Sequence, residues 1–178
     1  MPRLTEKQIK RLKASKEDFV RIPLTKGQVA IIDKKNIDKV APYSWCASKH
    51  GNTYYVKTCL RRGNKYITMY LHRLLLTLEK NEKCDHRDGN GLNNRENNIR
   101  GCTNQQNGFN SRKQKNCLSR FKGVCFDKSR NKYIAQIMKN GILKFLGRFK
   151  KETDAGLAYN KTAIKEEYFG KYAKLNEI

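Results

Sequence analysis

The sequence predicts an α+β protein made of small antiparallel sheets and short helices. Short runs rich in β-branched and aromatic residues alternate with turn residues, which is typical of short strands. Apolar residues at helical spacing occur only over brief stretches. A chain of 178 residues can form one globular domain or two small ones, each with a modest core. We therefore expect two compact modules joined by a basic linker.

The N-terminal part is expected to contain an arm followed by a small sheet. Residues 3–16 alternate Lys or Arg with apolar positions, which permits a short helix but favours a solvated arm, and we assign 1–20 to this arm. Composition then predicts strands at 28–33 (QVAIID), 43–46 and 53–57 (TYYVK), and a helical turn at 35–40.

The central part is predicted to run helix, strand, loop, strand, helix. The first helix is indicated by helical spacing of Leu71, Leu74, Leu75 and Leu78. It carries His72, which we interpret as a structural residue more than as a ligand. Residues 81–100 are rich in Asn, Asp and Gly, which predicts a long loop between strands near 83–87 and 98–102. Thr103 suits the N-cap of a helix that ends near Ser111.

The C-terminal part is predicted to be a three-stranded sheet with one helix. Strands are expected at 121–126, 132–139 and 142–149, and a helix whose small residues lie on one side is expected over 155–164, with Gly170 near its end. Asn140-Gly141 is a strong hairpin signal between the last two strands. Basic residues with little apolar periodicity make 111–118 the predicted linker.

Charge and composition narrow the function classes. Lys and Arg number 39 against 16 acidic residues, a net charge of +23 that favours a polyanionic partner, above all nucleic acid. No apolar stretch approaches the roughly 20 residues that cross a bilayer, and no signal peptide is evident. The six cysteines form no CxxC pair, so the sequence signals neither a zinc ribbon nor a disulfide framework. We expect an intracellular protein without a membrane partner or a small-molecule cofactor.

A polar cluster in the middle of the chain carries the chemistry. Asp85 and His86 are neighbours, and Asn98 and Asn107 follow at spacings that suit metal-assisted phosphodiester cleavage. Neighbours on a strand point to opposite faces, so Asp85 and His86 serve one site only if the strand end is irregular. The Asp-Gly and Asn-Gly pairs at 88–91 permit such a bend.

Residues 71–107 resemble the HNH nuclease family, in the group common among homing endonucleases. The matching segments are LHRLLL at 71–76, DHRDGNGLNNRENNIR at 85–100 and TNQQN at 103–107. The resemblance implies a small ββα-metal nuclease domain, which with the N-terminal sheet spans 21–110. By the same resemblance Asp85 and Asn107 are metal ligands, His86 is the general base and Asn98 braces the loop.

The group that this chain resembles carries Asn, here Asn107, where other family members carry a final His, and this favours one Mg²⁺ or Mn²⁺ ion over zinc. One departure from the family pattern also bears on this site. Cys84 stands before Asp85, where an apolar residue is usual, and Arg100 and Gly101 stand where bulkier residues are common. We expect these last changes to affect packing more than chemistry.

Residues 119–175 resemble an AP2 DNA-binding domain, through SRFKGVCFDKSRNKYIAQI, LKFLGRF, DAGLAYNKTAI and YFGKYAKLN, and we assign 119–178 to this domain. The resemblance implies a three-stranded antiparallel sheet that packs on one helix and lies in the DNA major groove. Its DNA-facing positions correspond to Lys122, Gln136 and Phe145. Phosphate contacts are expected from Lys128, Arg130, Lys132, Lys144 and Arg148. The family's other base-reading positions hold Cys125, Asp127, Met138 and Leu143 instead of mostly Arg, so its base preference does not carry over.

The order of the two modules resembles mobile HNH-AP2 endonucleases of phages and bacteria. We therefore expect a metal-dependent DNA endonuclease that acts as a monomer on double-stranded DNA, in the cytoplasm of a bacterial or phage-infected cell. A non-catalytic AP2-type DNA-binding regulator is the main alternative. RNA binding or RNA cleavage is a third possibility, supported by the positive charge alone.

Overall fold

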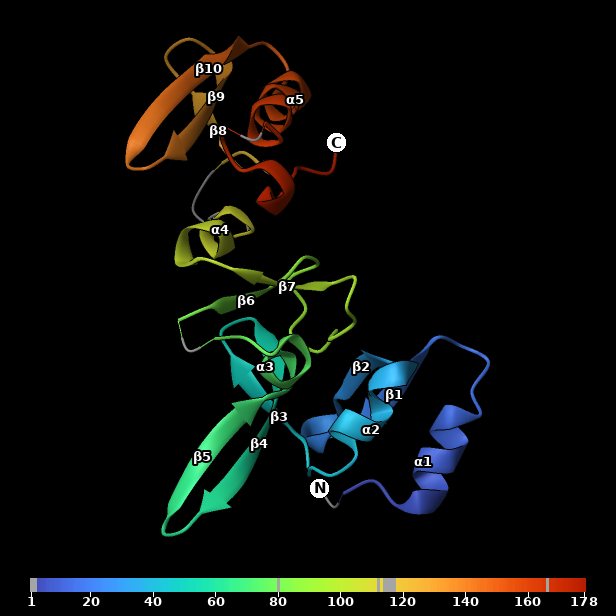
Figure 1. Ribbon diagram of the computed structural model, residues 1–178. Coiled ribbons are helices and arrows are strands. Elements are labelled where there is room, and N and C mark those ends of the chain that lie inside the picture. The colour runs from blue at the N-terminus through green and yellow to red at the C-terminus, as the bar shows by residue number, and fades with distance from the viewer. Residues whose placement is uncertain (1–2, 80, 112, 114–117, 166) are drawn as a thin grey trace. The chain divides into compact units, whose positions relative to one another are not determined.

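The computed structural model describes residues 3–79, 81–111, 113, 118–165 and 167–178. It shows a mixed α+β protein with several small antiparallel sheets, as the sequence predicts (Figure 1). The chain divides into two compact units, Met1–Asn104 and Gln105–Ile178. In the described part of the chain, no helix is both long enough and apolar enough to cross a membrane.

The first unit opens with a helix where we expected a solvated arm. Helix α1 (Glu6–Lys13) has a capping box in which Thr5 and Gln8 exchange hydrogen bonds. Its basic residues point outward, while Ile9 and Leu12 pack against the core of the unit. The segment takes the short-helix form that the sequence permits, because alternating apolar positions give it a face that it can bury.

A hairpin and short helical turns follow α1. Strands β1 (Phe19–Pro23) and β2 (Val29–Asp33) pair antiparallel around the short 3₁₀ turn η1 (Thr25–Gly27). The 3₁₀ turn η2 (Lys34–Asn36) and helix α2 (Ile37–Val40) confirm the predicted helical turn. The core of the unit begins here and consists of Val20, Ile22, Leu24, Ala30, Ile32, Ile37, Val40, Trp45, Ala47, Val56 and Leu71.

The second sheet of this unit has the order β3-β4-β5. Its strands are β3 (Cys46–His50), β4 (Thr53–Arg62) and β5 (Lys65–Tyr70). The strand predicted at 43–46 in fact starts only at Cys46, because Trp45 is taken into the core, where its indole N–H donates to the Val40 carbonyl. Helix α3 (Leu71–Leu76) follows and confirms the helix predicted from leucine spacing.

The central hairpin and helix agree with the predicted order. Strands β6 (Lys83–His86) and β7 (Ile99–Cys102) pair antiparallel, with Asp85 opposite Arg100 and His86 opposite Ile99. Helix α4 (Asn104–Phe109) starts directly after Thr103.

The second unit contains the sheet β10-β9-β8 and helix α5. Its elements are β8 (Val124–Asp127), β9 (Lys132–Lys139), β10 (Ile142–Phe149), α5 (Glu152–Ala163) and the 3₁₀ turn η3 (Gly170–Tyr172). The β9–β10 turn has positive φ at Asn140 (52°) and Gly141 (76°), which confirms the Asn-Gly hairpin. The helix ends at Ala163, well before Gly170. Most of the predicted linker 111–118 lies outside the described residues.

Helix α5 packs on the sheet through small residues. Ala155 lies in one core cluster with Ala135 and Phe121, and Ala163 and Tyr159 lie in another with Ile137. Small side chains let the helix backbone approach the strands closely. The opposite face of the sheet, which carries Gln136 and Met138, is left uncovered by α5.

Candidate functional site

The loop between β6 and β7 is held by its own side chains. The carboxamide of Asn98 accepts a hydrogen bond from the backbone N–H of Asp88 (3.1 Å) and donates to the Asp88 carboxylate (3.0 Å) and the Asn93 carbonyl (2.8 Å). Asn98 is buried. Through these hydrogen bonds, Asn98 fixes the conformation of the loop that follows His86.

The same loop is anchored to the first hairpin. The Asp33 carboxylate accepts hydrogen bonds from Nε of Arg95 (2.9 Å) and from the backbone N–H of Glu96 (2.7 Å). The backbone of Ile31 donates to Leu92 and accepts from Asn94. These contacts tie the loop, and with it the end of β6, to the core of the first unit.

Asp85 faces an arginine across the β6–β7 ladder. Its Oδ2 accepts hydrogen bonds from Nε (2.7 Å) and Nη2 (2.5 Å) of Arg100. The side chains are 4% and 11% exposed, so this is a buried ion pair. A carboxylate here therefore stabilises a cation in a largely water-free position.

His86 is buried on the face of β6 that packs against aromatic side chains and another histidine from other elements. Its ring lies edge-on to His72 (centroids 5.3 Å apart) and to Tyr55 (5.7 Å). Burial lowers the pKa of His86, although Asn94, Asp88 and Asp85 partly oppose this shift. The imidazole is therefore neutral near pH 7, which is the state that can accept a proton.

Neighbouring Asp85 and His86 thus contact different partners, as expected for adjacent strand residues. Asn107, the other predicted ligand, is an exposed residue of α4 in the second unit. Its place beside Asp85 stays a prediction.

The chain resembles a named viral protein over nearly its whole length. It is 34% identical to an uncharacterized HNH endonuclease of Acanthamoeba polyphaga mimivirus, over 192 aligned positions that cover 99% of this chain and 95% of the relative. The chain belongs to the HNH endonuclease family. Searches found no matching family model and no matching solved structure.

HNH nucleases generally use a divalent metal ion. The residues of this HNH protein suit such an ion in their chemistry. Asp85 is an anionic oxygen donor, here paired with the Arg100 guanidinium that a metal ion would have to displace or share, and Asn107 offers a neutral amide oxygen. Oxygen donors of these two kinds are the ones that Mg²⁺ and Mn²⁺ prefer.

Sequence reasoning missed a second group of potential ligands in this HNH protein. His72 of α3 approaches Cys84 and His86 of β6, and one ligand atom of each lies within 4.8 Å of the other two. The signals present in the sequence were the Cys84 departure from the family pattern and its two-residue spacing from His86. Only the packing of α3 on the hairpin brings His72 to them.

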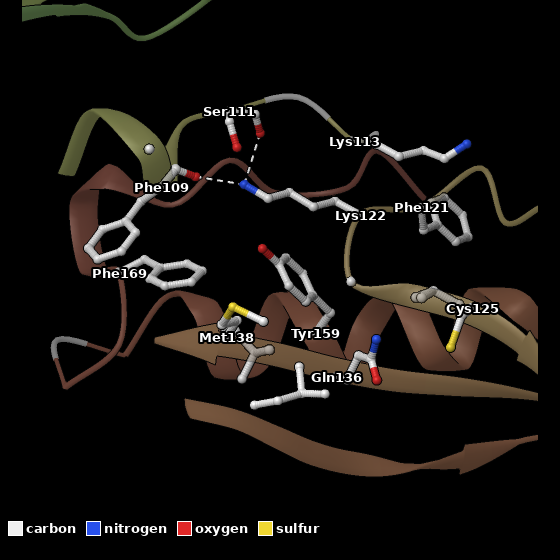
Figure 2. A pocket seen from close by; sticks show the side chains of 15 residues that line it. Phe109, Ser111, Lys113, Phe121, Lys122, Cys125, Gln136, Met138, Tyr159 and Phe169 are labelled. Carbon is white, nitrogen blue, oxygen red and sulfur yellow. Dashed lines mark hydrogen bonds between the residues drawn. The ribbon is translucent and has the colours of Figure 1, made fainter. Parts of the chain in front are cut away.

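In the second unit, Lys122 is partly buried. Its ammonium donates to the backbone carbonyls of Phe109 and Ser111, both at 2.8 Å, as the dashed lines in Figure 2 show. Burial lowers its pKa to about 8. Lys122 therefore fastens the start of the sheet to the segment after α4.

The other residues predicted to contact DNA are more accessible. Phe145 is 54% exposed and lies under the guanidinium of Arg148, at 5.1 Å from its ring centroid. Gln136 is half-buried on the uncovered face of β9 and lines the hollow drawn in Figure 2. The exposed cationic residues of the predicted set are Lys128, Arg130, Lys132, Lys144 and Arg148.

Proposed function

We propose that this protein is a metal-dependent DNA endonuclease that hydrolyses phosphodiester bonds. The observation that carries the proposal is the β6–β7 hairpin, which holds the neighbouring residues Asp85 and His86 at the end of β6 and is braced by Asn98, in a chain of the HNH endonuclease family. Strand pairing is regular through His86, so the proposal requires the end of β6 to rearrange when DNA and metal bind, which brings the imidazole and the carboxylate to one phosphate.

His86 is the general base in this proposal. It takes the proton from a water molecule as that water attacks the phosphorus atom. Burial keeps the imidazole neutral and ready to accept the proton. Asn98 holds the loop that follows His86, so it positions the base without contacting the DNA.

Asp85 and Asn107 would hold one Mg²⁺ or Mn²⁺ ion. When bound, the ion supplies positive charge to the phosphate oxygens and to the departing 3′ oxygen. In the structure, Arg100 fixes the orientation of the Asp85 carboxylate through two hydrogen bonds to the same carboxylate oxygen. Arg100 is therefore a positioning residue.

Double-stranded DNA is the proposed substrate, bound by a monomer. The net charge of +23 favours a polyanion. We assign the second unit an AP2-like role, in which the uncovered sheet face meets the groove and the exposed cations meet phosphates. The β4–β5 hairpin, which Figure 1 shows extending from α3, adds an exposed cationic and aromatic tip with Arg61, Arg62, Lys65 and Tyr66.

A non-catalytic DNA-binding regulator gains no support from the comparisons, because the matching relative is named as an endonuclease. A direct experiment decides between the two functions. Supercoiled plasmid is incubated with the purified protein and Mg²⁺ or Mn²⁺, with and without a chelator. We expect nicked or linear DNA only in the presence of metal. Sequence-specific binding that ignores the chelator and leaves the plasmid intact would support the regulator instead.

A parallel arm tests the choice of nucleic acid. Unlabelled duplex DNA and duplex RNA are added in turn as competitors of the plasmid. Because the proposed groove and phosphate contacts are those of B-form DNA, we expect DNA to compete at lower concentration. Stronger competition by RNA would contradict DNA as the substrate.

A further inference from the structure

The cluster of His72, Cys84 and His86 has the geometry of a compact ligand set. Cys84 and His86 are two residues apart on β6, so their side chains leave the same face of the strand. His72 reaches that face from α3, and the three ligand atoms lie within 4.8 Å of one another. A tetrahedral zinc ion with bonds of about 2.0 to 2.3 Å needs ligand atoms about 3.3 to 3.7 Å apart. A small side-chain shift is enough to reach that spacing.

His72 offers a donor atom to a metal. Nδ1 of His72 is buried, and no described residue gives it a hydrogen bond. Sγ of Cys84 makes a long contact to the Asp85 carbonyl, at 3.8 Å, and a hydrogen bond with the backbone of Arg100. Burial lowers the pKa of His72 to about 3, so its imidazole is neutral and keeps a lone pair for coordination.

The chemistry of the set differs from that of Asp85 and Asn107. Two imidazole nitrogens and one thiolate are ligands for Zn²⁺ and similar borderline ions, whereas Mg²⁺ prefers oxygen. Three protein ligands leave a fourth position open. The thiol proton is lost to solvent when the metal–sulfur bond forms.

We propose that His72, Cys84 and His86 bind one Zn²⁺ ion, and that this ion inhibits DNA cleavage by occupying the nitrogen of His86. The binding site stands on the geometry of the cluster alone. The inhibition rests on the proposed function, because it requires His86 to be the general base. Zinc and the catalytic ion would then use different ligands and act in opposite directions.

Binding is tested on the full chain with Co²⁺ as a spectroscopic substitute for zinc. Protein freed of metal by a chelator and then desalted is titrated with Co²⁺. We expect the intense visible absorption of tetrahedral Co²⁺, a thiolate charge-transfer band in the near ultraviolet, and loss of both on addition of one equivalent of Zn²⁺. Absence of the thiolate band at saturating Co²⁺ would overturn the site.

Matched variants show which residues form the site. Cys84→Ser should remove the thiolate band, whereas Cys59→Ser, which changes an exposed cysteine, should keep it. His50→Ala, which changes an exposed histidine, should also keep the full spectrum. Melting curves confirm that each variant is folded. A thiolate band that survives in folded Cys84→Ser would overturn the assignment.

Cleavage assays test the inhibition separately. In Mg²⁺ we expect added Zn²⁺ to slow cleavage by the unaltered protein at least tenfold, and Cys84→Ser to need at least tenfold more Zn²⁺ for the same effect. Equal zinc sensitivity of the two proteins would overturn the inhibition. If Co²⁺ binds as expected but no metal supports cleavage, the proposed function fails while the site stands. If cleavage occurs without Co²⁺ binding, the site fails while the function stands.

Discussion

Acid should destabilise the first unit through His72. Burial lowers the pKa of this histidine to about 3, from about 6.5 in an unfolded chain. Between these two values the unfolded chain binds a proton that the folded chain does not bind. The free energy of unfolding therefore falls as the pH falls through this window, and the effect is absent above about pH 6.5.

The size of the effect follows from the two pKa values. Each pH unit inside the window changes the free energy of unfolding by about 1.4 kcal/mol for one proton. At pH 5, about 1.5 units below the upper end of the window, His72 should lower the free energy of unfolding by about 2 kcal/mol relative to pH 7.5. His72→Phe removes this cost. Phe can keep the ring stack on Tyr70, whose centroid lies 5.4 Å from that of His72.

The assay is urea unfolding of both proteins in chelator, near pH 7.5 and near pH 5. Trp45 is the single tryptophan and is buried in the core of the first unit, so its fluorescence reports that unit. The unaltered protein should lose about 2 kcal/mol more than His72→Phe between the two pH values. His50→Phe, at an exposed site, should behave like the unaltered protein. Equal losses in the unaltered protein and His72→Phe would refute the reasoning.

Two further predictions concern the loop and the second unit. Gly91→Ala places a Cβ atom 2.5 Å from the Tyr54 carbonyl oxygen, so urea unfolding should show a loss of about 2 kcal/mol, whereas Gly108→Ala meets no atom within 4 Å and should cost nothing. An unchanged Gly91→Ala protein would contradict the docked loop. Lys122→Met should lower the melting temperature with little change in DNA affinity, whereas Lys144→Met should weaken DNA binding without affecting melting. The reverse pattern, measured by titration of labelled duplex, would place Lys122 on the DNA.

The second unit was the most predictable part of the fold, because its signals are local. The Asn140-Gly141 turn fixes the β9–β10 hairpin, and the small residues of α5 lie on its buried side. The first unit was less predictable. Strand β1 has only five residues, and β4 continues to Arg62 because it pairs with β5. Such pairing depends on distant partners that a local pattern does not contain.

The secondary structure that carries the candidate site was predictable from sequence spacing. Strands β6 and β7 and the start of α4 follow from the polar loop and its flanks. The environments of individual side chains were not predictable. Lys122 belongs to a DNA-facing set by resemblance, yet folding brings its ammonium to two backbone carbonyls. His72 joins Cys84 only through the packing of α3.

The most direct test of the central claim is the cleavage rate of His86→Ala. Single-turnover cleavage of plasmid in Mg²⁺ or Mn²⁺ is compared with that of the unaltered protein, with melting curves and DNA binding as controls for folding. Loss of the general base should slow cleavage at least about 100-fold while DNA binding is retained, and free imidazole should restore part of the rate. Cleavage by folded His86→Ala at the unaltered rate would contradict the account.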